Sequence, residues 1–164
     1  MDKIILNEMD PNFKNEIAAQ PGAEHIQRCF TCGTCTAACP VAEVNDDYDP
    51  RKIIRMCILG MRKEVLSSDM LWMCSQCYTC YALCPQGVKF SDVMDVLRGM
   101  AIKEGYVPKE QYKEVKDLDK FVQELRCEII NQKLHPEGDH EKKVKEMIEK
   151  GLKIEWKKLK TENK

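Results

Sequence analysis

Apolar positions along this chain recur at intervals of three and four residues, which predicts amphipathic helices. The clearest stretch lies between Asp49 and Gly60. Asp49-Pro50 is typical of a helix N-cap followed by its first turn, and glycine is typical of the position just past a helix end. One apolar face is expected on this helix, formed by Ile53, Ile54, Cys57, Ile58 and Met61.

Several other stretches show the same helical period. No clean alternation of apolar and polar residues flanks them, so strands are not expected. The prediction is therefore a mainly α fold. Ser91 and Asp139 are the predicted N-caps of two of these helices, and Pro108 opens a third. The predicted helices cover about 11–20, 49–60, 68–73, 91–105, 108–130 and 139–151.

Eight of the ten cysteines fall into two matching runs. Each cysteine of the first run recurs 45 residues later, and so does the proline that follows the run. The pattern C-x2-C-x2-C-x3-C-P is typical of bacterial [4Fe–4S] ligation, so two runs predict two cubane clusters. The predicted ligands are Cys29, Cys32, Cys35 and Cys39 in the first run, and Cys74, Cys77, Cys80 and Cys84 in the second.

The fourth cysteine of each run follows a short helical turn, which the next proline stops. This turn leads the fourth thiolate away from the first three cysteines of its run. In two-cluster ferredoxins, the fourth thiolate binds the other cluster. Gly33 suits a loop position with positive φ, whereas the second loop has Ser75 and Gln76, so the repeat is expected to be imperfect there. The predicted sets are Cys29, Cys32, Cys35 and Cys84 for cluster 1, and Cys74, Cys77, Cys80 and Cys39 for cluster 2.

Two other uses of cysteine fit the pattern less well. Structural zinc usually takes two C-x2-C pairs, which would leave half of each run surplus. Disulfides need an oxidising compartment, and no secretion signal is visible. Cys57 and Cys127 lie within apolar helical patterns and are expected to be structural. Arg28 and Lys89 flank the loops and are candidates for charge compensation, with a solvated surface role as the alternative.

Composition limits the remaining possibilities. The 164 residues are 32% charged with both signs mixed and a net charge of −1, which gives no sign of nucleic-acid binding. No stretch approaches the roughly 20 apolar residues of a membrane helix, so we expect no membrane span and a cytoplasmic location. The predicted organisation is an N-terminal extension over 1–22, a cluster-binding domain over 23–105, and a helical, partner-contacting extension over 106–164. Its tail, 152–164, is expected either to dock on a partner or to pack on its own domain or be partly disordered.

Over roughly residues 25–105, the chain resembles the α-helical ferredoxin modules of redox complexes. The resemblance rests on the two cysteine runs and on Asp-Pro-Arg-Lys-Ile-Ile-Arg-Met at 49–56. Such modules occur in succinate dehydrogenase, fumarate reductase, anaerobic glycerol-3-phosphate dehydrogenase and heterodisulfide reductase. Among them, the chain is most similar to the C-subunit family of heterodisulfide reductases from methanogenic archaea. There is no C-x4-C-x2-C run before residue 29, as a succinate dehydrogenase iron–sulfur subunit would carry.

The resemblance implies an electron-transfer subunit without a catalytic site of its own. Its two [4Fe–4S] clusters would relay electrons from a flavin- and iron–sulfur-containing subunit to the catalytic subunit. That subunit reduces the heterodisulfide of coenzymes M and B in methanogenesis, in some cases within a larger complex with a hydrogenase or formate dehydrogenase. In keeping with this role, the chain has no adjacent Cys-Cys pair and no G-x-G-x-x-G flavin fingerprint. The alternatives are a carrier subunit of a glycerol 3-phosphate, glycolate or lactate dehydrogenase, and a free soluble ferredoxin.

Overall fold

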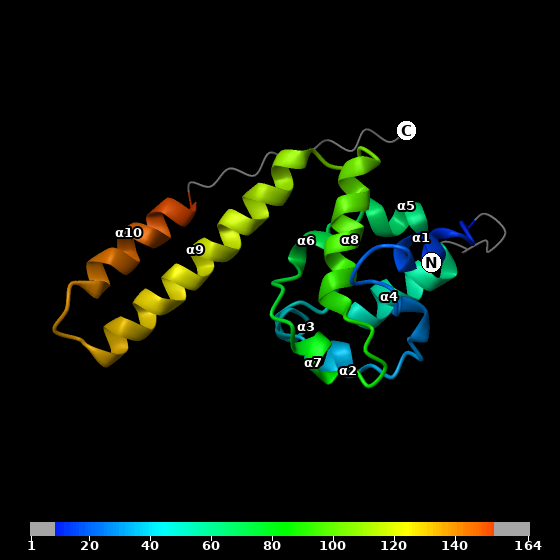
Figure 1. The fold of residues 1–164 in the computed structure, drawn as a ribbon. Helices are drawn as coiled ribbons and strands as arrows, with labels where there is room; N and C mark the ends of the chain where they lie inside the picture. The colour runs from blue at the N-terminus through cyan, green and yellow to red at the C-terminus, as the bar shows by residue number, and fades with distance from the viewer. Residues whose placement is uncertain (1–8, 153–164) are drawn as a thin grey trace. The chain divides into compact units, whose positions relative to one another are not determined.

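The computed structural model describes residues 9–152, which form α helices and one short 3-10 helix (Figure 1). Within this range there is no strand, so the prediction of a mainly α fold is confirmed. The chain divides into two compact units, Met1–Val107 and Pro108–Lys164. The domain boundaries predicted from sequence at 22/23 and 105/106 stay predictions.

The first unit holds all eight run cysteines. Its longest helices, α4 and α8, supply eight of the 19 buried residues of the core, and short helices connect the cysteine loops to them. Its elements are α1 (Phe13–Ala18), η2 (Ile26–Arg28), α2 (Thr34–Ala37), α3 (Pro40–Val44), α4 (Pro50–Leu59), α5 (Arg62–Leu66), α6 (Met70–Met73), α7 (Thr79–Leu83) and α8 (Phe90–Lys103).

Helix α4 begins and ends as its sequence predicts. The Asp49 carboxylate accepts a hydrogen bond from the Lys52 N–H at 3.1 Å, and Pro50 occupies the first turn. The helix ends at Gly60 with φ 82°. A side chain at Gly60 would collide with the Asp10 carbonyl oxygen, and the Asp10 N–H donates to the Gly60 carbonyl at 2.9 Å. Glycine is therefore required both by the backbone conformation and by the close approach of the N-terminal segment.

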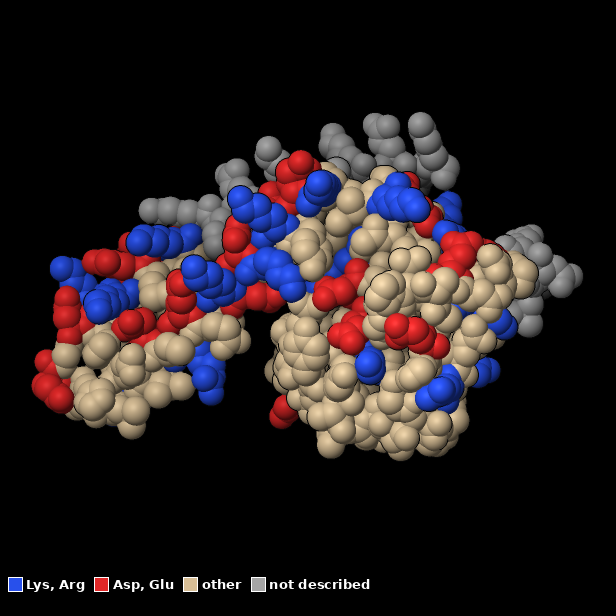
Figure 2. Space-filling model, in the orientation of Figure 1, with Lys and Arg blue, Asp and Glu red and all other residues tan. Residues whose placement is uncertain are grey.

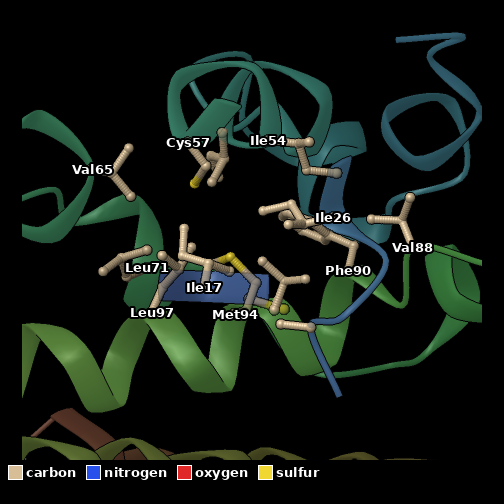
Figure 3. Close-up of a cluster of buried hydrophobic side chains, with 14 of the residues drawn as sticks. Ile17, Ile26, Ile54, Cys57, Val65, Leu71, Val88, Phe90, Met94 and Leu97 are labelled. Carbon is tan, nitrogen blue, oxygen red and sulfur yellow. The ribbon is translucent and has the colours of Figure 1, made fainter. Parts of the chain in front are cut away.

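The core of the first unit is a single apolar cluster between α1, α4, α5, α6 and α8 (Figure 3). Ile54 and Cys57 from α4 face Ile17 of α1 and Met94 and Leu97 of α8 across it. Burial raises the pKa of the Cys57 thiol to about 12, so this cysteine behaves as a small hydrophobic residue, in keeping with its predicted place on the apolar face.

The start of α8 differs from the prediction. Ser91 is the predicted N-cap, but the helix begins at Phe90, and Lys89 at φ 56° occupies the capping position. Ser91 is buried within the first turn. The reason is that Phe90 is needed in the core, so the capping position lies two residues earlier than the predicted Ser91.

A charged cluster that the sequence does not reveal joins three helices of this unit. The Arg62 guanidinium at the start of α5 pairs with Asp10 and Glu16 at 2.8 Å and with Glu104 at 2.7 Å. The same group lies 5.1 Å from the centre of the Phe13 ring. One arginine thus links the N-terminal segment to the end of α8.

The second unit contains α9 (Lys109–Leu134) and α10 (His140–Leu152), which lie side by side as a helical hairpin (Figure 1). His140 at the start of α10 lies 2.8 Å from the Glu128 carboxylate on α9. Cys127 is exposed on α9, contrary to its predicted place on an apolar face. Most of the predicted tail, 153–164, lies outside the described residues. No described helix is both long and apolar enough to cross a membrane.

Candidate metal centres

The two cysteine loops repeat in conformation as well as in sequence. Thr31 and its counterpart Gln76 have φ of 61° and 50°, and Gly33 and its counterpart Tyr78 have φ of 87° and 61°. Gly33 then occupies the N-cap position of α2, and Tyr78 that of α7. The expectation of an imperfect repeat is therefore wrong for the backbone, because Tyr78 adopts the conformation that glycine adopts in the first loop.

The first loop forms one wall of a cavity. Its walls are largely apolar and include Phe30, Ile54, Val88 and Phe90. Five sulfur-bearing side chains line it, namely Cys29, Cys32, Cys35, Cys80 and Cys84.

The second loop forms one wall of a second cavity. Tyr48 and Ser91 line it beside apolar groups from α3 and α8. Its cysteines are Cys39, Cys74, Cys77 and Cys80. Because Cys80 and Phe90 line both cavities, the two sites are direct neighbours.

The fourth cysteine of each run faces the cavity of the other run. Cys84 lines the first cavity and Cys39 lines the second. This is the grouping that the predicted crossed ligand sets require. The assignment of individual thiolates to clusters stays a prediction, but the chain fold brings together the groups that it names.

Hydrogen bonds reach several of these sulfurs, from backbone and from side chains. The Thr31 N–H donates to Cys29 Sγ, and the Val88 N–H donates to Cys84 Sγ, both at 3.4 Å. Such donors stabilise thiolates and cluster sulfurs, because they point positive hydrogen toward negative sulfur.

A threonine two residues after the second cysteine repeats in both loops. Thr34 Oγ1 lies 3.3 Å from Cys32 Sγ, and Thr79 Oγ1 lies 3.4 Å from Cys77 Sγ. Hydrogen bonds from the Thr34 hydroxyl and N–H lower the pKa of Cys32. At Cys77 burial acts against deprotonation, but the bonds from Thr79 prevail and lower its pKa.

The thiols deeper in the loops behave in the opposite way. Burial raises the pKa of Cys35 and Cys74. Burial, together with the nearby Cys74, raises the pKa of Cys80 to about 11. Because metals bind the deprotonated thiolate, loading these positions releases protons that the free chain holds firmly.

Two arginines supply positive charge near the cavities. Arg51 lines the first cavity, and Arg98 donates a hydrogen bond to the Cys74 carbonyl at 2.8 Å beside the second. Arg51 lies in the 49–56 segment, but neither arginine is among the residues that the sequence indicated for charge compensation. The candidates Arg28 and Lys89 line neither cavity, and the Lys89 ammonium lies 5.5 Å from the centre of the Tyr81 ring.

The residues present fit a [4Fe–4S] cluster at each cavity. Each cavity has four cysteines in the predicted sets, and four cysteine thiolates are the usual donors to such clusters. In the second cavity, hydrogen bonds from the buried hydroxyls of Tyr48 and Ser91 favour the thiolates of Cys74 and Cys80, and the sulfurs of a bound cluster would accept from both. No three Cys, His, Asp or Glu side chains within 9–152 are placed to share one metal ion. A cubane instead offers each thiolate its own iron.

Comparison with known proteins identifies the same region. Residues 25–88 match the family model of the 4Fe-4S dicluster domain. The iron-sulfur C subunit of CoB–CoM heterodisulfide reductase from Methanopyrus kandleri is 41% identical over 116 residues, which are 66% of this chain and 60% of that protein. The C subunit of the H(2):CoB-CoM heterodisulfide,ferredoxin reductase from Methanothermobacter marburgensis is 39% identical over 99 residues, 60% of this chain and 52% of that protein.

A third relative extends the comparison to another type of complex. The C subunit of the ferredoxin:CoB-CoM heterodisulfide reductase from Methanosarcina acetivorans is 42% identical over 85 residues, 52% of this chain and 34% of that protein. The chain thus spans 60% or less of the length of these relatives. The prediction of two [4Fe–4S] clusters is confirmed by the domain match. Residues 25–88 form a 4Fe-4S dicluster domain, and the chain is similar to the iron–sulfur C subunits of heterodisulfide reductases.

Proposed function

We propose that this chain is the electron-transferring iron–sulfur subunit of a heterodisulfide reductase. It passes single electrons from a flavin- and iron–sulfur-containing subunit to the catalytic subunit that reduces the heterodisulfide of coenzymes M and B. The names of its relatives support the substrate. H(2) in the name of the Methanothermobacter marburgensis relative, and H(2)/formate in the name of a C2 subunit from Methanococcus maripaludis that is 38% identical, support a hydrogenase or formate dehydrogenase as the more distant electron source. We place this assembly in the cytoplasm, where thiols remain reduced.

The observation that carries the proposal is the pair of adjacent cavities with exchanged cysteines. When bound, the two clusters supply two one-electron centres. We propose that Cys29, Cys32, Cys35 and Cys84 hold one, and that Cys74, Cys77, Cys80 and Cys39 hold the other. Cys80 and Phe90 line both cavities, so the two sites are separated only by this shared wall. A short path of this kind favours electron transfer over storage.

The surface around the loops supports a fixed place in a complex. Phe30 is 58% exposed, Leu83 51% and Tyr78 49%, although all three are large apolar or aromatic side chains. Figure 2 shows few charges over the end of the first unit that carries α2 and α7. Exposed apolar patches of this kind mark protein interaction sites.

The second unit has a similar unburied surface. On α9 and α10, the exposed apolar side chains are Val122, Ile129, Ile130, Leu134 and Ile148. We propose that this hairpin contacts a partner subunit. The apolar surface of the two units also argues against a freely diffusing ferredoxin, which has no partner to cover it.

No described residue is suited to cleave the substrate disulfide. Eight cysteines are assigned to the clusters, the Cys57 thiol is buried with its pKa raised to about 12, and the exposed Cys127 on α9 is the only cysteine after residue 84, so it has no second thiol from its own unit. Reactive thiols instead have lowered pKa values at accessible positions. We therefore expect the isolated chain to exchange electrons without reducing the heterodisulfide.

The test is reconstitution of a heterodisulfide reductase from which this subunit has been removed. Adding the cluster-loaded chain should restore heterodisulfide reduction, and a Cys57→Ser variant should restore it equally. A Cys74→Ser variant should not. Failure of the fully loaded chain to restore turnover refutes the proposal. Turnover by the chain alone would show an active site in it, and restoration of a different dehydrogenase would assign it to that complex.

A further inference from the structure

Arg98 places a fully buried positive charge against the second cysteine loop. Its side chain on α8 is 0% exposed. Nε donates to the Leu71 carbonyl at 2.7 Å, and Nη2 donates to the Cys74 carbonyl at 2.8 Å. The guanidinium is therefore held by the first and last carbonyl groups of residues 71–74, the segment that leads into the second loop.

This charge is only partly compensated. Asp95 Oδ1 lies 3.6 Å from Nη1, but the Asp95 side chain is 37% exposed, so water weakens its effect. The guanidinium also lies 5.7 Å from the centre of the Trp72 ring, whose face favours a cation without neutralising it. Arginine stays protonated in proteins, so the positive charge is permanent.

Two hydroxyls add fixed donors to the same site. Tyr48 and Ser91 both line the second cavity, where hydrogen bonds from their hydroxyls favour the thiolates of Cys74 and Cys80. Tyr48 is 1% exposed and Ser91 is 1% exposed, so water does not compete for either group. A negative sulfur in this cavity would accept both bonds.

The described residues that line the first cavity include neither a buried arginine nor a tyrosine or serine hydroxyl. Phe30, Ile54 and Val88 give it apolar walls, and its arginine is exposed. The Arg51 side chain is 49% exposed and lies 3.9 Å from the Asp49 carboxylate. Its charge is therefore screened by water, salt and a nearby anion.

We propose that Arg98, Tyr48 and Ser91 give the cluster of the second cavity the higher reduction potential. Reduction adds a negative charge, which a buried cation and hydrogen-bond donors stabilise. The burial of Cys74 and Cys80 alone would disfavour that charge, and the three polar groups outweigh it. The electron of the half-reduced chain therefore resides at the second cavity. If the proposed function holds, electrons enter at the first loop and leave from the second.

The experiment is a redox titration of the full-length, cluster-loaded chain followed by electron paramagnetic resonance. The native chain should show two one-electron steps. Arg98→Met should lower only the higher midpoint and reduce the ratio of reduced to oxidised cluster by about tenfold. For one electron, a tenfold change corresponds to about 59 mV. Arg98→Lys keeps the charge, so its higher midpoint should stay close to the native value. A merely structural role of Arg98 would not predict this.

Two milder variants keep the proposal open to refutation where Arg98→Met fails to fold. Tyr48→Phe and Ser91→Ala should each lower the higher midpoint by a smaller amount and leave the lower one in place. Arg51→Met, the matched control at the first cavity, should leave the higher midpoint unchanged. A shift of the lower midpoint alone, equal shifts of both, or no shift with these variants overturns the proposal. Because the readout uses the isolated chain, it is independent of whether reconstitution succeeds.

Discussion

The first cysteine loop, residues 29–39, and the second, residues 74–84, follow the same backbone path in different surroundings. Both use two residues with positive φ and a threonine that contacts sulfur. The first loop is more open, with Cys29 and Cys35 half-buried, whereas Cys74 and Cys80 are buried. The first cavity has apolar walls and an exposed arginine, and the second has buried hydroxyls and a buried arginine nearby.

This difference separates two kinds of information in a duplicated motif. The spacing of the cysteines dictates how the chain turns around a cluster, so it repeats wherever the spacing repeats. The properties of each site come from other elements, such as α8 and the residues before α4, which are not duplicated. Two copies of one motif can therefore hold clusters of different potential.

The largest effect is expected from the cysteines that the two loops exchange. Cys39→Ser should damage the cluster of the second cavity, and Cys84→Ser should damage that of the first, because each side chain faces the other loop's cavity. Native protein should hold about eight iron and eight sulfide per chain, and each variant should lose up to half of them. Iron and sulfide analysis with electron paramagnetic resonance measures which signal disappears.

Two cysteines outside the runs provide the matched control. Cys57→Ser and Cys127→Ser should keep the native iron content, since neither side chain lines either of the two cavities. The crossed assignment is wrong if Cys39→Ser removes the signal that the first three cysteines of its own run support. Partial loss of both clusters from either variant is compatible with it, because cluster binding also stabilises the fold.

The helices and the grouping of the cysteines follow from short-range sequence signals. Asp49-Pro50 and Gly60 predict both ends of α4, and the helical spacing predicts that Cys57 joins the apolar face. The doubled spacing also names all the cysteines that line the two cavities. These features depend on neighbours in sequence, which is why periodicity and capping residues reveal them.

Features that depend on distant residues are not predictable in the same way. Arg98 reads as one charged position on a helix, and only the fold shows that its partners are carbonyls of Leu71 and Cys74. Tyr48 has no motif that would mark it as a cavity residue. The hydroxyls and charges around a cluster are long-range neighbours, so a single sequence carries little signal for them.

The left-handed position of the two loops offers a test of intermediate size. Gly33→Ala should destabilise the first loop by roughly 1 kcal/mol, because an L residue resists its φ of 87°. Tyr78→Gly should leave the stability of the second loop almost unchanged. Relief of the strained φ is offset by the flexibility of glycine and by loss of the ring contact with Tyr81, whose centre lies 6.2 Å away.

The rate of cluster loss in guanidinium, followed by visible absorbance, measures both changes. Gly33→Ala should lose iron roughly fivefold faster than native protein, as about 1 kcal/mol implies. Tyr78→Gly should remain close to native. A strong destabilisation by Tyr78→Gly would show that the second loop depends on the Tyr78 side chain, and the two loops would then differ in backbone preference as well as in surroundings.

The smallest expected effect comes from removing a single threonine hydroxyl from each loop. Thr34→Val and Thr79→Val keep the side-chain shape and remove the hydroxyl near Cys32 Sγ or Cys77 Sγ. Each loss should cost the reduced cluster about 1 kcal/mol of hydrogen-bond stabilisation and lower one midpoint accordingly. If the second cluster has the higher potential, Thr79→Val narrows the gap between the two midpoints and Thr34→Val widens it. A redox titration in which Thr79→Val narrows the gap and Thr34→Val widens it would establish this order of the clusters without altering Arg98, and the reverse pattern would contradict it.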